Sequence, residues 1–170
     1  NIESKVDNET ARENVLRFAG SQGRNADWQE IDDHYRINID APSGSESPDA
    51  PTKETSTGRN KPVLMITTNL LGQGSEELGA MLMRNFIYTL TEREDLPRAI
   101  ILMNSGVKLS IKESSSIEEL KALENRGVNI LVCGTCLDYY QLKNDLETGQ
   151  ISNMYDISDM LFEAEKVLII

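Results

Sequence analysis

The sequence predicts an α/β fold in which a mostly parallel β-sheet is covered by helices on both faces. Short, uninterrupted apolar runs, such as Val63–Ile66 and residues 130–133, have the composition of strands that are buried on both sides. These runs alternate with segments whose apolar residues recur at helical spacing. Because alternation of strand and helix is the pattern of parallel pairing, we expect a layered sheet within residues 62–170.

The ends of the predicted elements follow from capping residues and from changes in apolar periodicity. Ser75 is expected to be the N-cap of a long helix, and Ser116 with Glu119 forms a capping box that opens another. Gly127 is expected to end that second helix, as glycine commonly does. The predicted order is strand 63–68, helix 75–91, strand 98–103, helix 116–125, strand 128–132, helix 137–146, helix 157–164 and strand 166–170.

The predicted helix 75–91 is apolar on nearly all sides, which is typical of a helix that is buried on two faces. One face is expected to meet the sheet. The other is expected to meet either a second subunit, in a homo-oligomer, or another segment of the same chain. The two stripes are Leu78, Met81, Leu82 and Phe86 on one side, and Ala80, Met83, Ile87 and Leu90 on the other.

A smaller unit, residues 1–40, precedes a segment of low apolar content. Residues 6–8 read as a strand end and a helix N-cap, and after the helix two runs of period 2 flank a turn at Asp32 and Asp33. We expect a partial α+β unit whose N-terminal half is missing, because so small a core is marginal alone. Residues 41–61 hold three of the five prolines and no large apolar residue, which predicts a flexible linker spanning roughly 25 Å.

Charge and hydropathy argue against several classes of partner. The formal net charge is −11, with 28 acidic and 17 basic residues, so the surface repels nucleic acid and anionic lipid. No apolar run approaches the ~20 residues of a membrane-spanning helix, and the first five residues lack the features of a secretory signal. We therefore expect a cytoplasmic protein that binds neither nucleic acid nor membranes.

The two cysteines and the single histidine limit the chemistry. A disulfide framework needs more cysteines spread along the chain, and a structural zinc site needs about four ligands. Cys133, Cys136 and the distant His34 are too few. We predict no metal site and no cofactor, and we expect a reducing compartment in which the thiols are kept for their reactivity.

Residues suited to chemistry follow three of the predicted strands. In open parallel sheets, ligands bind beyond the carboxyl ends of the strands. Cys133 ends a strand just before a predicted helix, where backbone N–H groups and the helix dipole lower the pKa of a thiol and make it nucleophilic. Two buried, inert cysteines are the alternative. The candidate residues are Asn69, Gly72 and Gly74 after the first strand, Asn104 and Ser105 after the second, and Cys133, Gly134, Thr135 and Cys136 after the third.

The glycine loop between Gly72 and Gly74 does not match a nucleotide-binding motif. It lacks the third glycine of a dinucleotide fingerprint and the lysine of a P-loop. Glu76 and Glu77, at the start of the helix, would repel a pyrophosphate. We interpret the loop mainly as a tight turn and helix cap.

Several motifs carry a resemblance to known families. They are residues 63–68, 72–79, 102–107 and 127–137 in the larger part, and residues 6–8, 11–15 and 18–23 in the smaller. Through these motifs residues 62–170 are similar to DsrE/DsrF-like sulfur-relay domains, and residues 1–40 resemble the second half of a TusA/SirA-like domain. This order of domains resembles YedF-type proteins, which are associated with selenium metabolism.

The resemblance implies a three-layer α/β/α fold that assembles into homo-oligomers. It also implies a cysteine that accepts sulfur as a persulfide and passes it on, at the position of Cys133. Cys136 has no equivalent in many relatives. The smaller unit lacks the Cys-Pro-x-Pro motif of TusA-like domains, so it has no reactive cysteine of its own.

Three hypotheses of function follow. In the leading one the protein is a sulfur or selenium carrier: the Cys133 thiolate takes sulfur from a donor protein and yields it to an acceptor protein, and Cys136 acts as a resolving thiol. The second is a dithiol redox protein of thioredoxin type. The third is a non-enzymatic, oligomeric binding module.

Overall fold

The computed structural model describes residues 2–21, 24–40 and 61–170. The chain divides into two compact units, Asn1–Thr55 and Ser56–Ile170. The predicted flexible linker, residues 41–61, lies outside the described residues except for Lys61.

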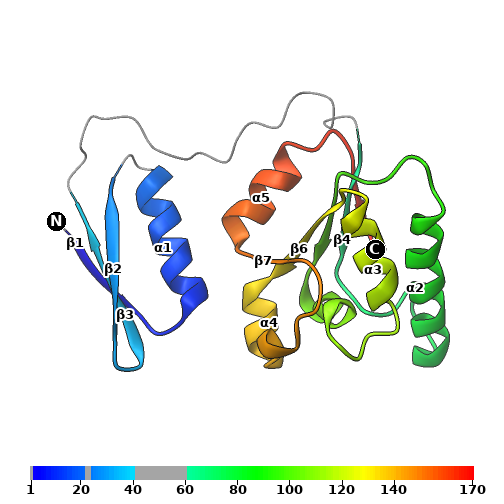
Figure 1. Ribbon diagram of the computed structural model, residues 1–170, viewed down its shortest axis with the longest axis horizontal. Coiled ribbons are helices and arrows are strands. Elements are labelled where there is room, and N and C mark those ends of the chain that lie inside the picture. The colour runs from blue at the N-terminus through cyan, green and yellow to red at the C-terminus, as the bar shows by residue number, and fades with distance from the viewer. Residues whose placement is uncertain (1, 22–23, 41–60) are drawn as a thin grey trace. The chain divides into compact units, whose positions relative to one another are not determined.

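The smaller unit is an antiparallel sheet of three strands with one helix packed on it (Figure 1). Its elements are β1 (Ile2–Val6), α1 (Glu9–Ser21), β2 (Ala26–Ile31) and β3 (His34–Ile39), in the strand order β1-β3-β2. Asn8 caps α1, because its Oδ1 accepts the backbone N–H of Ala11 at 2.8 Å. The predicted succession of strand, helix and hairpin is confirmed.

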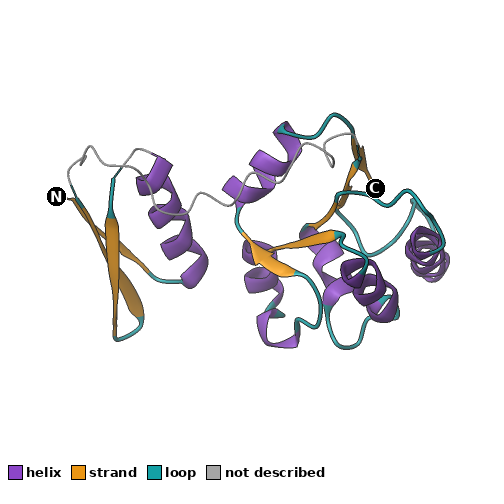
Figure 2. Ribbon diagram, turned by 45° about the horizontal axis from the view of Figure 1, so that its top comes forward, coloured by secondary structure: helices purple, strands orange, loops and turns teal. Residues whose placement is uncertain are grey.

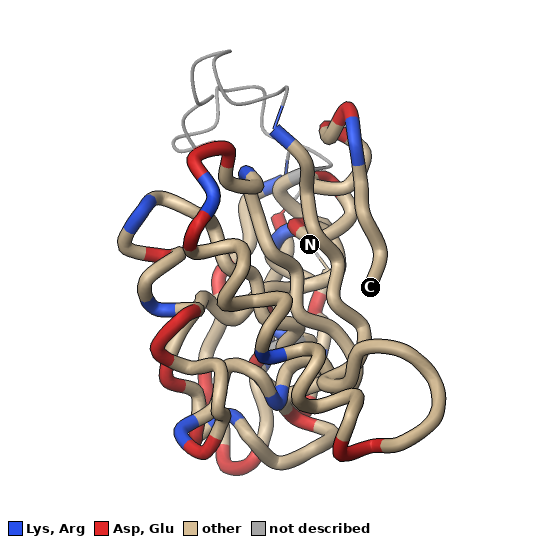
Figure 3. The backbone as a smooth tube through the Cα atoms, turned by 90° about the vertical axis from the view of Figure 1, so that its right-hand side faces the viewer, with Lys and Arg blue, Asp and Glu red and all other residues tan. Residues whose placement is uncertain are grey.

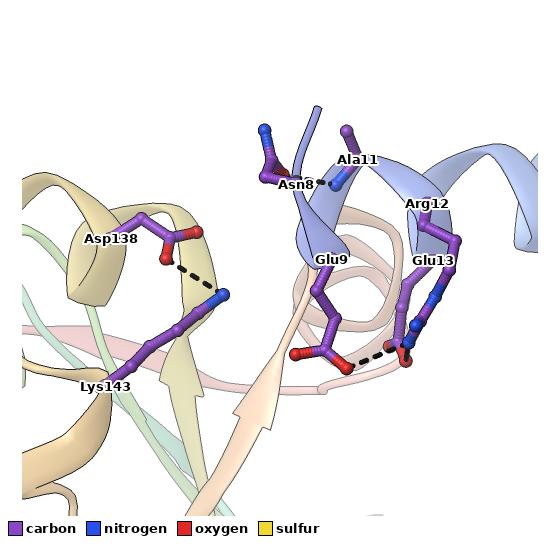
Figure 4. A network of polar contacts seen from close by, with 7 residues as sticks. All are labelled: Asn8, Glu9, Ala11, Arg12, Glu13, Asp138 and Lys143. Atoms are coloured by element: carbon purple, nitrogen blue, oxygen red, sulfur yellow. Dashed lines mark hydrogen bonds and ion pairs between the residues drawn. The ribbon is translucent and has the colours of Figure 1, made fainter. Parts of the chain in front are cut away.

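Arg12 joins the helix of the smaller unit to its hairpin. The guanidinium lies 4.1 Å from the ring centre of Trp28 and 4.9 Å from that of Tyr35. It also forms ion pairs with Glu9 at 2.9 Å and with Glu13 at 3.3 Å (Figure 4). Because the buried core of this unit is small, these contacts supply part of the packing between helix and sheet.

The larger unit is a five-stranded parallel sheet between two layers of helices (Figures 1 and 2). Its elements are β4 (Val63–Ile66), α2 (Glu76–Thr91), β5 (Ala99–Leu102), the 3₁₀ helix η1 (Asn104–Ser110), α3 (Ile117–Asn125), β6 (Asn129–Cys133), α4 (Gly134–Tyr140), the 3₁₀ helix η2 (Lys143–Asp145), β7 (Gln150–Ser152), α5 (Met154–Phe162) and β8 (Val167–Ile169). The strand order is β7-β6-β5-β4-β8, and every neighbouring pair is parallel. Helices α2 and α3 lie on one side of the sheet, and α4 and α5 lie on the other. The predicted three-layer α/β/α fold is confirmed.

The apolar strand runs fill the core of the larger unit. Every residue of β5 is fully buried, because helices cover both faces of this central strand. From the helices, Met83 and Ile87 of α2 and Leu120 and Leu123 of α3 enter the same core. This packing holds the ends of β4, β5 and β6 in fixed relation to one another.

Several predicted element positions are wrong in the second half of the larger unit. The helix predicted at 137–146 begins earlier, at Gly134, and ends at Tyr140, because Gln141 adopts a left-handed conformation with φ 59°. Helix α5 begins at Met154, since Asn153 caps it through a hydrogen bond from the N–H of Asp156. The sequence pattern indicates neither η1 nor β7, because β7 is a three-residue edge strand with two exposed residues.

Helix α2 has one apolar stripe against the sheet and another that is exposed. The buried stripe is Met83, Ile87 and Leu90, and the exposed stripe is Leu78, Met81 and Leu82, with exposed fractions of 52%, 56% and 41%. Two predicted positions are exchanged: Phe86 packs against the core, and Ala80 is exposed. Within the described residues, no other segment of the chain buries the exposed stripe.

The loop between β4 and α2 carries no charged residue before Glu76 and Glu77, in the first turn of α2 (Figure 3). Carboxylates are favourable there, because the start of a helix carries partial positive charge. The predicted N-cap is confirmed, since the Oγ of Ser75 accepts the N–H of Leu78 at 3.3 Å. Among the helices that the structure describes, none has the length and apolar character to cross a membrane.

Candidate functional site

Three loops leave the same edge of the larger sheet, one after each of the strands β4, β5 and β6. These strands are parallel and adjacent in the order, so their carboxyl ends lie together. The pairing register sets Ile66 beside Leu102, and Leu102 beside Val132. The loops therefore begin at nearly the same level, and the predicted site residues line one edge.

Cys133 is the last residue of β6 and immediately precedes α4. It is only 3% exposed and packs in the main hydrophobic core, because β6 lies between β5 and β7. Its backbone is extended, with φ −61° and ψ 113°, as is usual at an N-cap, but its side chain makes no capping hydrogen bond. Cys133 is thus at the predicted junction but is shielded from solvent.

Burial raises the pKa of the Cys133 thiol from its ordinary value of 9.0 to about 11, and a hydrogen bond with the Cys136 thiol adds to this effect. The backbone N–H groups of Cys136 and Thr135, at the start of α4, lower the pKa but do not compensate. The expectation that the helix start lowers this pKa overall is therefore wrong. Removing solvent from a thiolate costs more than a short helix recovers.

Cys136 lies within the first turn of α4 and is partly exposed. Its Sγ accepts the backbone N–H of Asn104, with 3.1 Å between nitrogen and sulfur. Asn104 is the first residue of η1, and Met103 before it provides no side-chain cap. The first N–H groups of a helix lack partners within it, so the sulfur of Cys136 satisfies one of them.

Asn104 has a left-handed backbone conformation, with φ 47°, which Asn tolerates better than most residues. Its side-chain Oδ1 accepts the hydroxyl hydrogen of Tyr140 at 2.9 Å. Tyr140 follows Cys136 by four residues, so both project from the same face of α4. Helix α4 therefore contacts Asn104 twice, through a sulfur on its N–H and a hydroxyl on its side chain.

Three contributors to this arrangement are absent from the predicted site residues. Tyr140 could have been found from its helical spacing to Cys136. Lys108, whose ammonium lies 4.7 Å from the ring centre of Tyr140, carries no sequence signal. Gly106 follows β5 closely: a Cβ there would lie 2.3 Å from the carbonyl oxygen of Ile66, so only glycine lets η1 pack against β4.

Asn69, Gly72 and Gly74 lie in the loop after β4, and this loop is tied to α2. The N–H of Leu71 donates to the carbonyl of Gly79 at 2.9 Å. Gly72 and Gly74 have φ values of 87° and 136°, where glycine is favoured. Within the described part of the chain, no hydrogen bond joins these three predicted residues to either cysteine. The interpretation of the loop as a turn and cap agrees with this geometry.

The remaining predicted residues lie beside the cysteines, and the backbone N–H of Thr135 is one of the groups that act on the Cys133 thiol. Ser105 is the second residue of η1 and is half-buried, Gly134 is buried at the start of α4, and Thr135 is exposed. The structure therefore brings together Cys133, Thr135, Cys136 and Asn104. In the described ranges, no three His, Cys, Asp or Glu side chains are grouped so that they could hold a metal ion.

This geometry is suited to sulfur chemistry. Both thiols are free rather than joined in a disulfide, and the neighbouring Cys136 thiol contributes to the raised pKa of Cys133. One is partly exposed and accepts an amide N–H, while the other is buried and protonated near neutral pH. A thiolate with access to solvent attacks disulfide or persulfide sulfur, and a second thiol close by can then attack the product.

Solved structures with a similar arrangement exist. The ychN protein from E. coli shares 18% sequence identity with this chain, and the match covers 65% of this chain and 99% of that one, with a TM-score of 0.51. Two proteins described as being of unknown function also match: MTH1491 from Methanobacterium thermoautotrophicum (18% identity, 65% and 99% coverage, TM-score 0.46) and BT1422 from Bacteroides thetaiotaomicron (17%, 68% and 100%, TM-score 0.48). At such identity, the likeness to the E. coli protein establishes a shared fold alone. No curated protein matches the sequence.

A family model described as the DsrE/DsrF-like family matches residues 68–169. The matched range runs from the loop after β4 to the end of β8, so it includes Asn104, both cysteines and Tyr140. It spans more than half of the chain, and the parallel sheet with its flanking helices has the fold of that family. The chain therefore belongs to the DsrE/DsrF-like family, which is generally associated with sulfur relay.

Proposed function

We propose that this protein is a sulfur or selenium carrier that holds sulfane sulfur on the Cys133–Cys136 pair and passes it from a donor protein to an acceptor protein. The observation that carries the proposal is a pair of free thiols at the carboxyl edge of the sheet, one of which accepts the backbone N–H of Asn104. Membership in a family associated with sulfur relay supports it. The resemblance assigns the persulfide to Cys133 and leaves Cys136 as its resolving partner.

The proposed transfer needs no external oxidant. A cysteine thiolate attacks the outer sulfur of a donor persulfide R–S–SH, the bond between the two donor sulfurs breaks, and R–S⁻ departs with the electron pair. The protein then carries Cys–S–SH. An acceptor thiolate attacks the outer sulfur in turn and regenerates the cysteine thiolate. A selenium atom in the transferred position follows the same electron count.

Mass spectrometry of the full chain after incubation with glutathione persulfide tests this function. We expect wild-type protein to gain one sulfur atom that a thiol reductant removes, or to release sulfide while the pair oxidises. The matched control replaces both thiols, as Cys133→Ala with Cys136→Ser, and should gain no sulfur. Equal labelling of wild type and control, or no reaction of the wild type, would contradict the proposal.

A dithiol redox protein of thioredoxin type is the second candidate. The contact between the two thiols, three residues apart at the start of α4, supports it, because such a pair can close a disulfide. Reduction of insulin disulfides by the reduced protein, together with a reduction potential near that of the glutathione pool, would favour this function. Persulfide loading without insulin reduction would favour the carrier.

We further propose that the protein forms a homo-oligomer through the exposed stripe of α2. Leu78, Met81 and Leu82 place three large apolar side chains on one face of one helix, and contiguous exposed apolar surface is characteristic of interaction sites. A purely non-enzymatic binding module would be favoured if both cysteines were fully buried and unreactive to alkylation. Cys136 is partly exposed, which favours the carrier instead.

For the smaller unit, we propose a partial TusA/SirA-like domain in a YedF-type arrangement. Support comes from the strand, helix and hairpin order of β1, α1, β2 and β3. Because the sequence of this unit holds no cysteine, its contribution would be docking of a donor or acceptor protein. Trp28→Ala, at a 43% exposed ring, should then leave loading by glutathione persulfide unchanged but slow transfer from a protein donor. Equal slowing of both reactions would contradict this division of roles.

A further inference from the structure

The two cysteines differ in solvent accessibility. The second cysteine of the motif is the more accessible one, whereas the order of the motif would make the first the reactive thiol. In a Cys-x-x-Cys pair at a helix start, the helix dipole and N–H groups are expected to activate the first cysteine. Here the first cysteine, Cys133, is 3% exposed and packs in the main core. Cys136 is partly exposed. A donor persulfide therefore finds surface at Cys136 and almost none at Cys133.

The hydrogen bonds favour the same cysteine. The N–H of Asn104 donates to the Sγ of Cys136 across 3.1 Å, and the hydroxyl of Tyr140 holds the side chain of Asn104. This donor is fixed before any reaction occurs, so it holds the sulfur of Cys136 in one position beside η1. The side chain of Cys133 makes no capping hydrogen bond, and the backbone N–H groups of Cys136 and Thr135 that act on its thiol do not compensate for its burial.

We infer that Cys136 is the receiving cysteine, which attacks the donor and carries the persulfide, and that Cys133 is the resolving cysteine. The inference rests on the proposed function of the pair in sulfur transfer, and it exchanges the roles that the resemblance assigns. It makes Asn104 the positioning residue for the receiving sulfur, through its backbone N–H.

Each step balances. The Cys136 thiolate attacks the outer sulfur of R–S–SH, the donor S–S bond breaks, and R–S⁻ leaves. When no acceptor arrives, Cys133 loses its proton and attacks the Sγ of Cys136, which forms the Cys133–Cys136 disulfide and expels HS⁻. The expelled sulfur gains two electrons and the two cysteine sulfurs lose two, and the proton from Cys133 converts HS⁻ to H₂S. A thiol reductant of the glutathione class then restores the dithiol.

Burial of the resolving thiol has a kinetic consequence. Because its pKa is raised to about 11, Cys133 remains protonated near neutral pH, and only a thiolate attacks sulfur efficiently. Resolution is therefore slow compared with loading. The persulfide on Cys136 persists long enough to meet an acceptor, and release of sulfide is the slower, competing path.

Single-cysteine variants of the full chain separate the two roles. With glutathione persulfide as the donor at neutral pH, Cys133→Ala should gain one sulfur at a rate within about twofold of wild type and release at least ~10-fold less sulfide. Cys136→Ser, which keeps a hydroxyl to accept the Asn104 N–H, should gain sulfur at least ~10-fold more slowly. Alkylation of wild-type protein by iodoacetamide with peptide mapping, which needs no variant, should label Cys136 first.

The outcomes distinguish this inference from the function on which it rests. Sulfur uptake by Cys136→Ser at the wild-type rate, or first alkylation at Cys133, overturns the order of the thiols and leaves the carrier function standing. No sulfur uptake and no sulfide release by wild-type protein overturns both. Should circular dichroism show that a variant is unfolded, the alkylation map of the wild type decides the order.

Discussion

Cys133 ends β6 and Cys136 lies in the first turn of α4, and the two thiols experience different environments. A helix start stabilises a negative charge by about 0.3–1 kcal/mol, and by up to ~2 kcal/mol in favourable geometry. A rise in the pKa of Cys133 from 9.0 to about 11 corresponds to a net ~3 kcal/mol against the thiolate. Desolvation therefore exceeds the helix contribution at Cys133. Cys136, by contrast, is partly exposed, and its sulfur accepts the N–H of Asn104.

The raised pKa of Cys133 predicts a dependence of stability on pH. Its thiol binds protons more tightly in the folded protein, with a pKa of about 11, than in the unfolded chain, near 9.0. The stabilisation is complete below about pH 9 and is lost as the pH rises through about 11. Between pH 8 and 10, the free energy of unfolding of the wild type should fall by about 1.3 kcal/mol more than that of Cys133→Ala, in urea titrations. If the free energy of unfolding fell equally with pH in the two proteins, the pKa of the Cys133 thiol would not be raised by folding.

Tyr140→Phe removes the hydroxyl that donates to Asn104 while it keeps the ring. Asn104 should then hold its N–H less firmly on the Sγ of Cys136, so alkylation of Cys136 should slow severalfold. Stability should fall by about 1 kcal/mol. The matched control is Tyr139→Phe, at a neighbouring ring that is 80% exposed, and it should change neither quantity. If both variants alkylate at the same rate, the hydroxyl does not position Asn104.

Among the elements, η1 decides where the hydrogen-bond donor lies. It follows β5 directly and starts with Asn104, and its close approach to β4 depends on Gly106. The N–H of Met103 donates to the carbonyl of Ile66 at 3.0 Å, and the N–H of Gly106 donates to Met103 at 2.8 Å. The ends of two neighbouring strands and the start of η1 are thus joined by backbone hydrogen bonds.

Gly106→Ala is expected to disrupt this junction. Its Cβ would lie 2.3 Å from the carbonyl oxygen of Ile66, and a backbone oxygen of a buried strand moves only with the strand. The free energy of unfolding should fall by about 2–3 kcal/mol, measured by chemical denaturation. Ser105→Ala, one residue earlier, adds no atom and should remain within about 0.5 kcal/mol of wild type. Equal stability of both variants would show that η1 shifts freely.

For the molecule as a whole, the notable element is α2, because one of its apolar stripes is not buried by the described part of the chain. Its buried stripe packs on the sheet, and its exposed stripe places Leu78, Met81 and Leu82 in solvent. Burial of such side chains contributes about 25 cal/mol per Å² of apolar surface. A second copy of the chain, covering this stripe, would recover that free energy in a homo-oligomer.

Met81→Glu should therefore dissociate the oligomer, because it places a charge in the centre of the exposed stripe. Sedimentation velocity should show a smaller species than the wild type at the same concentration. Ala80→Glu adds the same charge to an exposed position of α2 outside this stripe and should sediment like the wild type. A monomeric wild type, or equal behaviour of the two variants, would contradict an interface at the exposed stripe.

Much of the architecture follows from local pattern. The strands β4, β5 and β8 lie within their predicted ranges, and β6 ends one residue beyond its range, at Cys133. For the central strands this follows because continuous apolar runs are required wherever a parallel strand is covered on both faces. The apolar stripes of α2 were largely predictable, because apolar residues recur at helical spacing along it. By contrast, β7 has no such run, since it lies at the sheet edge with two of its three residues exposed.

Composition and spacing predicted where the thiol pair lies, which is at the carboxyl end of a buried parallel strand and the start of a helix. They did not predict which of the two thiols is exposed and which is buried. That difference depends on how completely the core surrounds Cys133 and on a hydrogen bond from Asn104, 32 residues before Cys136 in the chain. Solvent access and contacts across that distance arise only when neighbouring strands align and η1 folds onto them, so tertiary packing, rather than local pattern, decided which sulfur is exposed.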